Sequence, residues 1–258
     1  MKTTCANVMQ MTSEQVLDIA VLAGKILLCS GAETYRVEDT ITRMCAVRGM
    51  NSVTVFCTPS VIIVSDEFAN GCTLMYRATR RGTDLGLISE INNLSFNWYQ
   101  WPYSYESTMR LLKEKLERPT RPPWLVALAS GVGAAAFAVM LGGNTYDFCA
   151  ALAAGFMAML VLRKLAVFRP SSFWETTLAG IILSLVAVAA VQINHECNLE
   201  NVIVGAIMPF LPGVALTNGL RDYMAGDLMS GNARVSEAVL LVGGLAVGMA
   251  AILSVWYM

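Results

Sequence analysis

Five long apolar segments in the second half of the chain constrain the fold more than any other feature. A helix needs roughly 20 apolar residues to cross the hydrocarbon core of a bilayer. The segments predict membrane-spanning helices at about 124–143, 148–165, 175–193, 199–220 and 236–257. Of the 258 residues, 55% are hydrophobic and only 14% are charged, which is more apolar side chain than one soluble core requires. We therefore predict an α-helical transmembrane domain over residues 119–258.

Residues 1–118 have a mixed composition, and their helix signals predict an aqueous domain. Thr12 with Gln15, and Ser30 with Glu33, fit the capping-box pattern in which a hydroxyl and an acid or amide open a helix. Apolar residues then recur at helical spacing on one face of each segment. We expect an amphipathic helical hairpin at the start of this domain.

Three strand-like segments follow the hairpin. They read "SVTVF", "SVIIVS" and "CTLMYRAT", are rich in β-branched and aromatic residues, and carry an Asn-Gly turn at 70–71 between the second and third. Two more amphipathic helices are expected near 87–94 and 109–116. Helices, strands and helices in this order predict an α+β domain.

The positive charges beside the predicted spans lie on one side of the membrane. Short flanks rich in Lys and Arg stay in the cytoplasm. The flanking residues are Lys113, Lys115, Arg118, Arg121, Arg163, Lys164, Arg169, Arg221 and Arg234. The opposite loops, "GNTYD" and "NHECNLEN", contain no Lys or Arg. We expect the N-terminal domain to be cytoplasmic and the C-terminus to lie across the membrane.

The fourth apolar segment carries residues that break helices. Pro209 and Pro212 remove backbone donors, and Gly213 loosens the chain, so this span should kink or unwind in its middle. Broken backbone at membrane depth must be buried in protein or line water, and in secondary transporters it forms substrate sites. A proline kink that only helps packing is the alternative.

Polar residues crowd the chain directly after this break. They are Asn218, Arg221, Asp222, Asp227 and Arg234, followed by Glu237 at the start of the fifth span. Arginine can hold a carboxylate through two hydrogen bonds, and an acid can carry a proton. We assign Arg221 and Arg234 to carboxylate contact and Asp222, Asp227 or Glu237 to coupling. An ordinary solvated loop is the alternative.

A second polar cluster, in "SGAETYRVED", contains Glu33, Arg36 and Glu38. Acids at the start of a helix also favour the helix dipole, so a structural role explains these residues well. The N-terminal domain has no histidine and no GxSxG elbow, which argues against serine hydrolase chemistry. Cysteine and histidine spacing predicts neither a metal site nor a disulfide framework.

The stretch "PFLPGVALTNGLRDYMAGDLMSGNARVSEA" resembles the signature of the threonine/serine exporter (ThrE-type) family, and "SGAETYRVEDTITRMCAVRG" and "CTPSVIIVS" resemble its N-terminal region. The resemblance implies a bacterial inner-membrane exporter of small amino acids or dicarboxylates. Single-chain exporters of this family continue into a second group of spans that this sequence lacks. The chain is therefore similar to the larger, YjjP-type subunit of the split form, which works in succinate export with a small YjjB-type membrane protein.

The resemblance and the composition together predict a non-enzymatic exporter subunit without cofactors and without a nucleic-acid partner. A homo-oligomer is an alternative assembly. The chain has no GxxxxGK[ST] motif, so transport should be secondary rather than ATP-driven. Two other functions stay open: a membrane-tethered enzyme, and a regulatory subunit that senses a metabolite without transporting it.

Overall fold

The computed structural model describes residues 11–47, 49–66, 72–78, 82–117, 121–168 and 171–258. The chain divides into two compact units. The mixed unit comprises Met1–Pro119 and Val214–Val235, and the helical unit comprises Thr120–Gly213 and Ser236–Met258. The chain thus leaves the helical unit at Gly213 and returns to it at Ser236.

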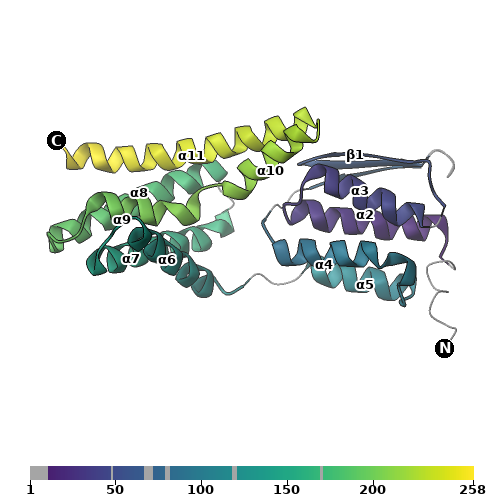
Figure 1. The fold of residues 1–258 in the computed structure, drawn as a ribbon, viewed down its shortest axis with the longest axis horizontal. Helices are drawn as coiled ribbons and strands as arrows, with labels where there is room; N and C mark the ends of the chain where they lie inside the picture. The colour runs from purple at the N-terminus through teal and green to yellow at the C-terminus, as the bar shows by residue number, and fades with distance from the viewer. Residues whose placement is uncertain (1–10, 48, 67–71, 79–81, 118–120, 169–170) are drawn as a thin grey trace. The chain divides into compact units, whose positions relative to one another are not determined.

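The mixed unit is a layered α+β structure. Its elements are α2 (Ser13–Cys29), α3 (Thr34–Ala46), β1 (Val53–Thr58), β2 (Val61–Asp66), β3 (Cys72–Arg77), α4 (Leu85–Phe96), η1 (Trp98–Gln100), α5 (Tyr105–Leu116) and α10 (Gly213–Met224). The strands form one antiparallel sheet in the order β1-β2-β3, as the sequence predicts. The sheet covers one side of the α2–α3 pair, and α4 and α5 cover the other (Figure 1). The Asn-Gly pair at 70–71 lies outside the described residues.

One of the two predicted capping boxes is confirmed. Thr12 accepts from the backbone of Gln15, and the Gln15 side chain accepts from the Thr12 backbone. The second box is wrong, because α2 continues to Cys29 and Ser30 caps its C-terminus instead. Glu33 is the residue before α3 and makes no capping hydrogen bond, so its carboxylate is available for other partners.

The helical unit supplies the apolar helices. Its elements are α6 (Pro123–Met140), α7 (Thr145–Leu165), η2 (Ala166–Phe168), α8 (Ser172–Ile193), α9 (Leu199–Ile207), η3 (Met208–Phe210) and most of α11 (Leu228–Trp256). Within the described residues, α6, α7, α8 and α11 are each long and apolar enough to cross a membrane. The pair of α9–η3 and α10 makes a fifth span if it is counted as one bent segment.

The break predicted in the fourth segment is confirmed, but the segment does not continue as one helix over 199–220. η3 ends at Phe210, and Leu211 is extended with a ψ of 134°, as expected before Pro212. α10 then runs to Met224 and packs in the mixed unit. The predicted loop before residue 236 is also shorter than expected, because α11 already begins at Leu228.

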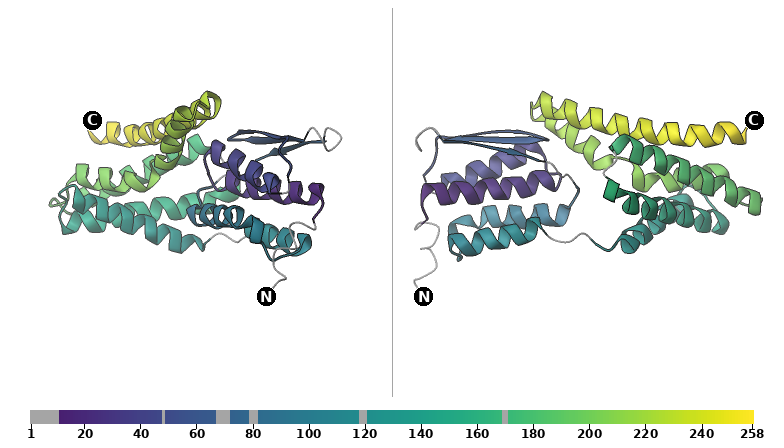
Figure 2. Two further views of the ribbon diagram at one scale, coloured as in Figure 1. Left: turned by 45° about the vertical axis from the view of Figure 1, so that its right-hand side comes forward. Right: turned by 180° about the vertical axis from the view of Figure 1, so that it is seen from behind.

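Small residues let the helices of the helical unit approach closely. A Cβ at Gly248 would collide with the Thr177 backbone oxygen of α8, and one at Gly244 would lie 2.7 Å from the Phe173 oxygen. Gly244 and Gly248, which have the GxxxG spacing, therefore serve helix packing within this chain. Figure 2 shows α8 and α11 side by side in two views.

Candidate functional site: a polar cluster on the mixed unit

A tight hairpin of α10 and α11 positions the polar residues that follow the broken helix. Gly226 turns the chain with a φ of 89°, a conformation that other residues adopt at a cost. Asp227 then accepts a hydrogen bond from Ser230 N at 3.0 Å and caps the first turn of α11. Gly219 lets the two helices meet, since a Cβ there would lie 3.0 Å from Val235 Cγ2.

The hairpin binds the turn between α2 and α3. Gly31 has a φ of 84°, and this turn leaves backbone carbonyls outside the helices. Asn218 Nδ2 donates to the Gly31 oxygen at 2.8 Å, and Arg234 Nη2 donates to the Ala32 oxygen at 2.6 Å. Two polar side chains thus satisfy a partly buried and a buried backbone acceptor, which would be costly to leave unpaired.

Thr34, the first residue of α3, meets two carboxylates. Asp222 Oδ1 accepts from Thr34 Oγ1 at 3.0 Å and from Thr34 N at 3.4 Å, and Asp227 Oδ2 lies 3.0 Å from the same hydroxyl. The start of a helix favours negative charge. A hydroxyl carries one proton, so it can donate to only one of these carboxylates at a time. The second carboxylate would bond best if it carried a proton itself.

Asp222 and Arg234 form a buried ion pair. Arg234 Nε lies 3.0 Å from Asp222 Oδ2, and the two side chains are 9% and 0% exposed. The two atoms are not aligned as a hydrogen bond, so the attraction is mainly coulombic. Removing one partner of such a pair leaves an uncompensated buried charge, which typically costs about 3–5 kcal/mol.

Glu33 joins the cluster to two arginines. Its side chain is 7% exposed, accepts from Arg36 Nε at 2.7 Å, and pairs with Arg221 of α10. Burial alone would raise the pKa of the Glu33 carboxyl, but hydrogen bonds from Arg36, its own backbone and Arg221 outweigh burial and lower the pKa. Glu33 is therefore ionised at neutral pH.

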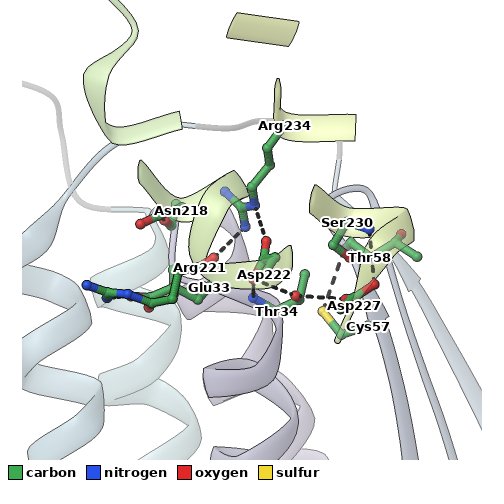
Figure 3. Close-up of polar contacts among 12 residues, drawn as sticks. Glu33, Thr34, Cys57, Thr58, Asn218, Arg221, Asp222, Asp227, Ser230 and Arg234 are labelled. Carbon is green, nitrogen blue, oxygen red and sulfur yellow. Dashed lines mark hydrogen bonds and ion pairs between the residues drawn. The ribbon is translucent and has the colours of Figure 1, made fainter. Parts of the chain in front are cut away.

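The pKa values of Glu38 and Asp227 are shifted in opposite directions. Glu38 Oε1 accepts from Cys57 N of β1 at 2.8 Å. Burial raises the pKa of Glu38, and the charges of Asp227 and Asp222 raise it further, although the Cys57 bond opposes this. Burial also acts on Asp227, but hydrogen bonds from Ser230 and Thr34 outweigh it and lower its pKa. Figure 3 shows Asp227, Thr34 and Asp222 in one hydrogen-bonded row.

The structure brings together most of the residues that the sequence singles out, although they come from two distant stretches. Those in the mixed unit are Glu33, Arg36, Glu38, Asn218, Arg221, Asp222, Asp227 and Arg234. The remaining four lie in the helical unit: Pro209, Pro212 and Gly213 form the break, and Glu237 lies in α11. The two polar clusters of the sequence are thus one site.

Thr34, Ser230 and the Gly31 and Ala32 carbonyls are the members of the site that sequence reasoning missed. Thr34 stands between the singled-out Glu33 and Arg36, so its hydroxyl was a signal that could have been used. The two carbonyls leave no trace in a sequence, because their availability depends on where α2 ends. Among the described residues, no group of His, Cys, Asp and Glu could hold a metal ion.

Several apolar helices, one of them interrupted, are the features of a multi-pass membrane protein. The chain belongs to the ThrE family, described as "Putative threonine/serine exporter", whose model matches residues 18–256. The family resemblance stated from the sequence is confirmed. Because the family is one of transporters, the prediction that the chain is not an enzyme is also confirmed.

Curated relatives cover the chain at low identity. It is 27% identical over 250 residues to the "Probable threonine/serine exporter" of Mycobacterium tuberculosis, covering 95% of this chain and 47% of that protein. It is 25% identical over 252 residues to the "Probable succinate transporter subunit YjjP" of Escherichia coli, covering 93% of this chain and 94% of that protein. The chain thus spans about half of one relative and nearly all of the other. No solved structure matches it.

Proposed function

We propose that this chain is a subunit of a secondary exporter that moves small carboxylate metabolites, a succinate-type dicarboxylate or threonine and serine, out of the cell. The observation that carries the proposal is the polar cluster, in which the residues after the broken helix bind the α2–α3 turn. The exporter and transporter names of the relatives support the substrate class.

The arginines of the cluster take different roles in this proposal. Arg221 is the carboxylate contact, since its side chain is 55% exposed and only Glu33 pairs with it among the described residues. Arg234 is buried against Asp222 and the Ala32 oxygen, so it holds α11 to the α2–α3 turn. This narrows the sequence-based assignment, which gave both arginines to the substrate.

The acids of the cluster support proton coupling. Asp222 and Asp227 share the single proton of the Thr34 hydroxyl, and a proton taken up by either carboxylate would complete the row of hydrogen bonds. A proton on Asp222 would also neutralise the partner of Arg234, so proton uptake and release would change how the hairpin is attached to the α2–α3 turn. Glu237 stays a second candidate for coupling.

The proposed orientation follows from the charge asymmetry. The mixed unit and the N-terminus are cytoplasmic, the C-terminus is periplasmic, and the membrane is the bacterial inner membrane. Arg118 and Arg169, two of the charges used, lie outside the described residues. A reporter fused after Met258 should behave as periplasmic. Cytoplasmic activity there, with periplasmic activity of a fusion near Pro170, would refute this topology.

A small YjjB-like membrane protein is the proposed partner, because the relative YjjP is named as a transporter subunit. The test expresses the chain alone and with that partner in cells that lack both, and measures efflux of preloaded succinate, serine and threonine. We expect export only when both are present. Full export by this chain alone would favour a homo-oligomer. Export by the partner alone would make this chain a regulatory subunit.

The variants Arg221→Ala and Asp222→Asn connect the cluster to export in the same assay. Both variants should stay in the membrane and should impair efflux per molecule of membrane protein, because Arg221→Ala removes the exposed guanidinium and Asp222→Asn removes a charge from the buried pair. Arg110→Ala, an exposed arginine of α5, is the matched control and should export normally. If both cluster variants export at the parental rate, the polar cluster has a structural role and no role in export.

A further inference from the structure

A small open pocket lies beside the polar cluster, entirely within the mixed unit. It has a volume of about 330 Å³, within the usual range for small-molecule sites. The α2–α3 turn, α4 and α10 supply its lining, so residues far apart in the chain meet there. None of the predicted roles of the cluster uses α4, which contributes four of the nine lining residues.

The charged groups of the pocket are two guanidiniums and one carboxylate. Arg36 and Arg221 line it together with Glu33. Glu33 is 7% exposed, whereas Arg36 and Arg221 are 28% and 55% exposed. The carboxylate is therefore the most buried of the three charged groups, and both guanidiniums are partly open to solvent. Each guanidinium has more donors than one shared carboxylate can use, so the pocket can still bind an anion.

The rest of the lining fits a short, polar ligand. Asn92 of α4 and Asn218 of α10 offer amide groups, and Asn218 uses its Nδ2 on the Gly31 oxygen, which leaves its Oδ1 for another donor. Leu85 and Ile88 add an apolar wall that suits a few methylene or methyl groups. A few placed polar groups on an apolar wall are typical of sites for small metabolites.

We propose that this pocket binds the carboxylate of a small metabolite through Arg36 and Arg221, with Asn92 as an additional contact. The choice of metabolites rests on the proposed export function, but the existence of the site does not. A bound carboxylate would compete with Glu33 for both guanidiniums. Because Arg221 belongs to α10, binding would alter the attachment of the segment that directly follows the helix break.

Succinate, serine and threonine all carry a carboxylate, and a binding experiment shows which of them the pocket accepts. The purified full chain, with its membrane partner where the partner is needed for stability, is titrated with succinate, serine and threonine by calorimetry. Succinamide and threonine amide, which lack the carboxylate, are the negative controls. We expect the carboxylates to bind and the amides not to bind. Serine and threonine would place an ammonium near Glu33, whereas succinate would place a second carboxylate near the arginines.

Three variants test the position of the site. Arg36→Gln should weaken binding by roughly tenfold or more, because it removes a charged hydrogen-bond donor. Asn92→Asp should weaken it comparably by placing a like charge in the pocket, and it changes none of the hydrogen bonds of the polar cluster. Arg110→Gln, on the exposed face of α5, should bind like the parent. The Asn92 variant keeps the test valid if Arg36→Gln does not fold.

The outcomes separate this site from the export proposal. Unchanged binding in Arg36→Gln and Asn92→Asp, or no binding of any carboxylate by the folded chain, overturns the pocket even if export is observed. Loss of binding in both variants, in a chain that exports none of the three metabolites, keeps the pocket and rejects the export function. Equal weakening in Arg110→Gln would also overturn the site, because it would show a general charge effect.

Discussion

The two units bury very different side chains. The core of the mixed unit contains large residues that are fully buried, such as Ile19, Ile26 and Trp98. The core of the helical unit consists mostly of alanines, which are Ala134, Ala138, Ala150, Ala151, Ala154, Ala158, Ala179, Ala187 and Ala206. Many of its large residues, for example Phe137 and Leu185, are exposed instead.

Two different solvents would explain this difference. In water, burial of large apolar side chains drives folding. In lipid, the surroundings are as apolar as leucine, so helices associate through close contact of small residues. We therefore propose that the mixed unit folds in water and the helical unit in the membrane. The following four comparisons test this interpretation, from the largest expected effect to the smallest.

Gly248→Leu should be the most damaging change in the helical unit. Any side chain there collides with the Thr177 backbone oxygen, which cannot move without separating α8 from α11. Overpacking usually costs about 1–3 kcal/mol and more when backbone must shift, so we expect loss of a monodisperse, cooperatively melting protein in detergent. Gly243→Leu is the matched control, because in the described chain a Cβ at Gly243 has no neighbour within 4 Å. Equal melting temperatures for the two variants would contradict the close helix contact.

Truncating one large residue in each core should have unequal effects. Ile26→Ala should destabilise the mixed unit by about 2–5 kcal/mol, because it loses both transfer free energy and packing. Leu183→Ala, also at a fully buried position, should cost the helical unit clearly less, because the transfer term is small in lipid. Hydrogen exchange of the backbone amides in each unit, measured for the parent and for each variant, gives the loss of stability in both units. A larger cost for Leu183→Ala would refute the interpretation.

Buried hydroxyl groups provide a third comparison. Thr34→Val should destabilise the mixed unit by about 1–3 kcal/mol, since it leaves Asp222 and Asp227 without their shared donor. Ser184→Ala should be neutral or slightly stabilising, because the buried Ser184 hydroxyl has no hydrogen-bond partner among the described residues. The same hydrogen-exchange measurement applies. Unchanged stability of the Thr34→Val variant would show that the hydrogen bonds of the Thr34 hydroxyl add little to the stability of the mixed unit.

The smallest expected effect is the pH dependence caused by Glu38. Its pKa is raised in the folded protein, mainly by burial and then by Asp227 and Asp222, so the folded state binds the proton more tightly than the unfolded state. Stability from this group is present at low pH and is lost as the pH rises through the folded pKa. Glu38→Gln should therefore be more stable than the parent at neutral pH.

That advantage should disappear as the pH falls below the ordinary glutamate pKa of about 4.3, because both side chains are then neutral. Gln can still accept the hydrogen bond from Cys57 N. Glu114→Gln, an exposed position on α5, is the control and should show no such pH dependence. Thermal melting between pH 4 and 8 compares the stability of each variant with that of the parent. A Glu38→Gln variant that is less stable than the parent at neutral pH would contradict the prediction.

Local signals in the sequence predicted many elements correctly. The Thr12 capping box, the three strands and the interruption at Pro209 and Pro212 depend on neighbouring residues or on backbone chemistry. The Ser30–Glu33 box failed because the same pattern also fits a helix end followed by a turn. Only the packing of α2 decided that its last turn extends to Cys29.

In the polar cluster, too, some features follow from local sequence and others only from packing. The sequence alone determined which residues carry charge, which segments are apolar enough for a membrane, and where the helix must break, because these properties belong to single residues or short windows. It could not determine that Glu33 and Thr34 meet Arg221, Asp222 and Asp227, which are 188 or more positions further along the chain. Tertiary structure decided this, because such contacts form only when α10 and the start of α11 pack within the mixed unit and bring Asn218 and Arg234 to the Gly31 and Ala32 carbonyls.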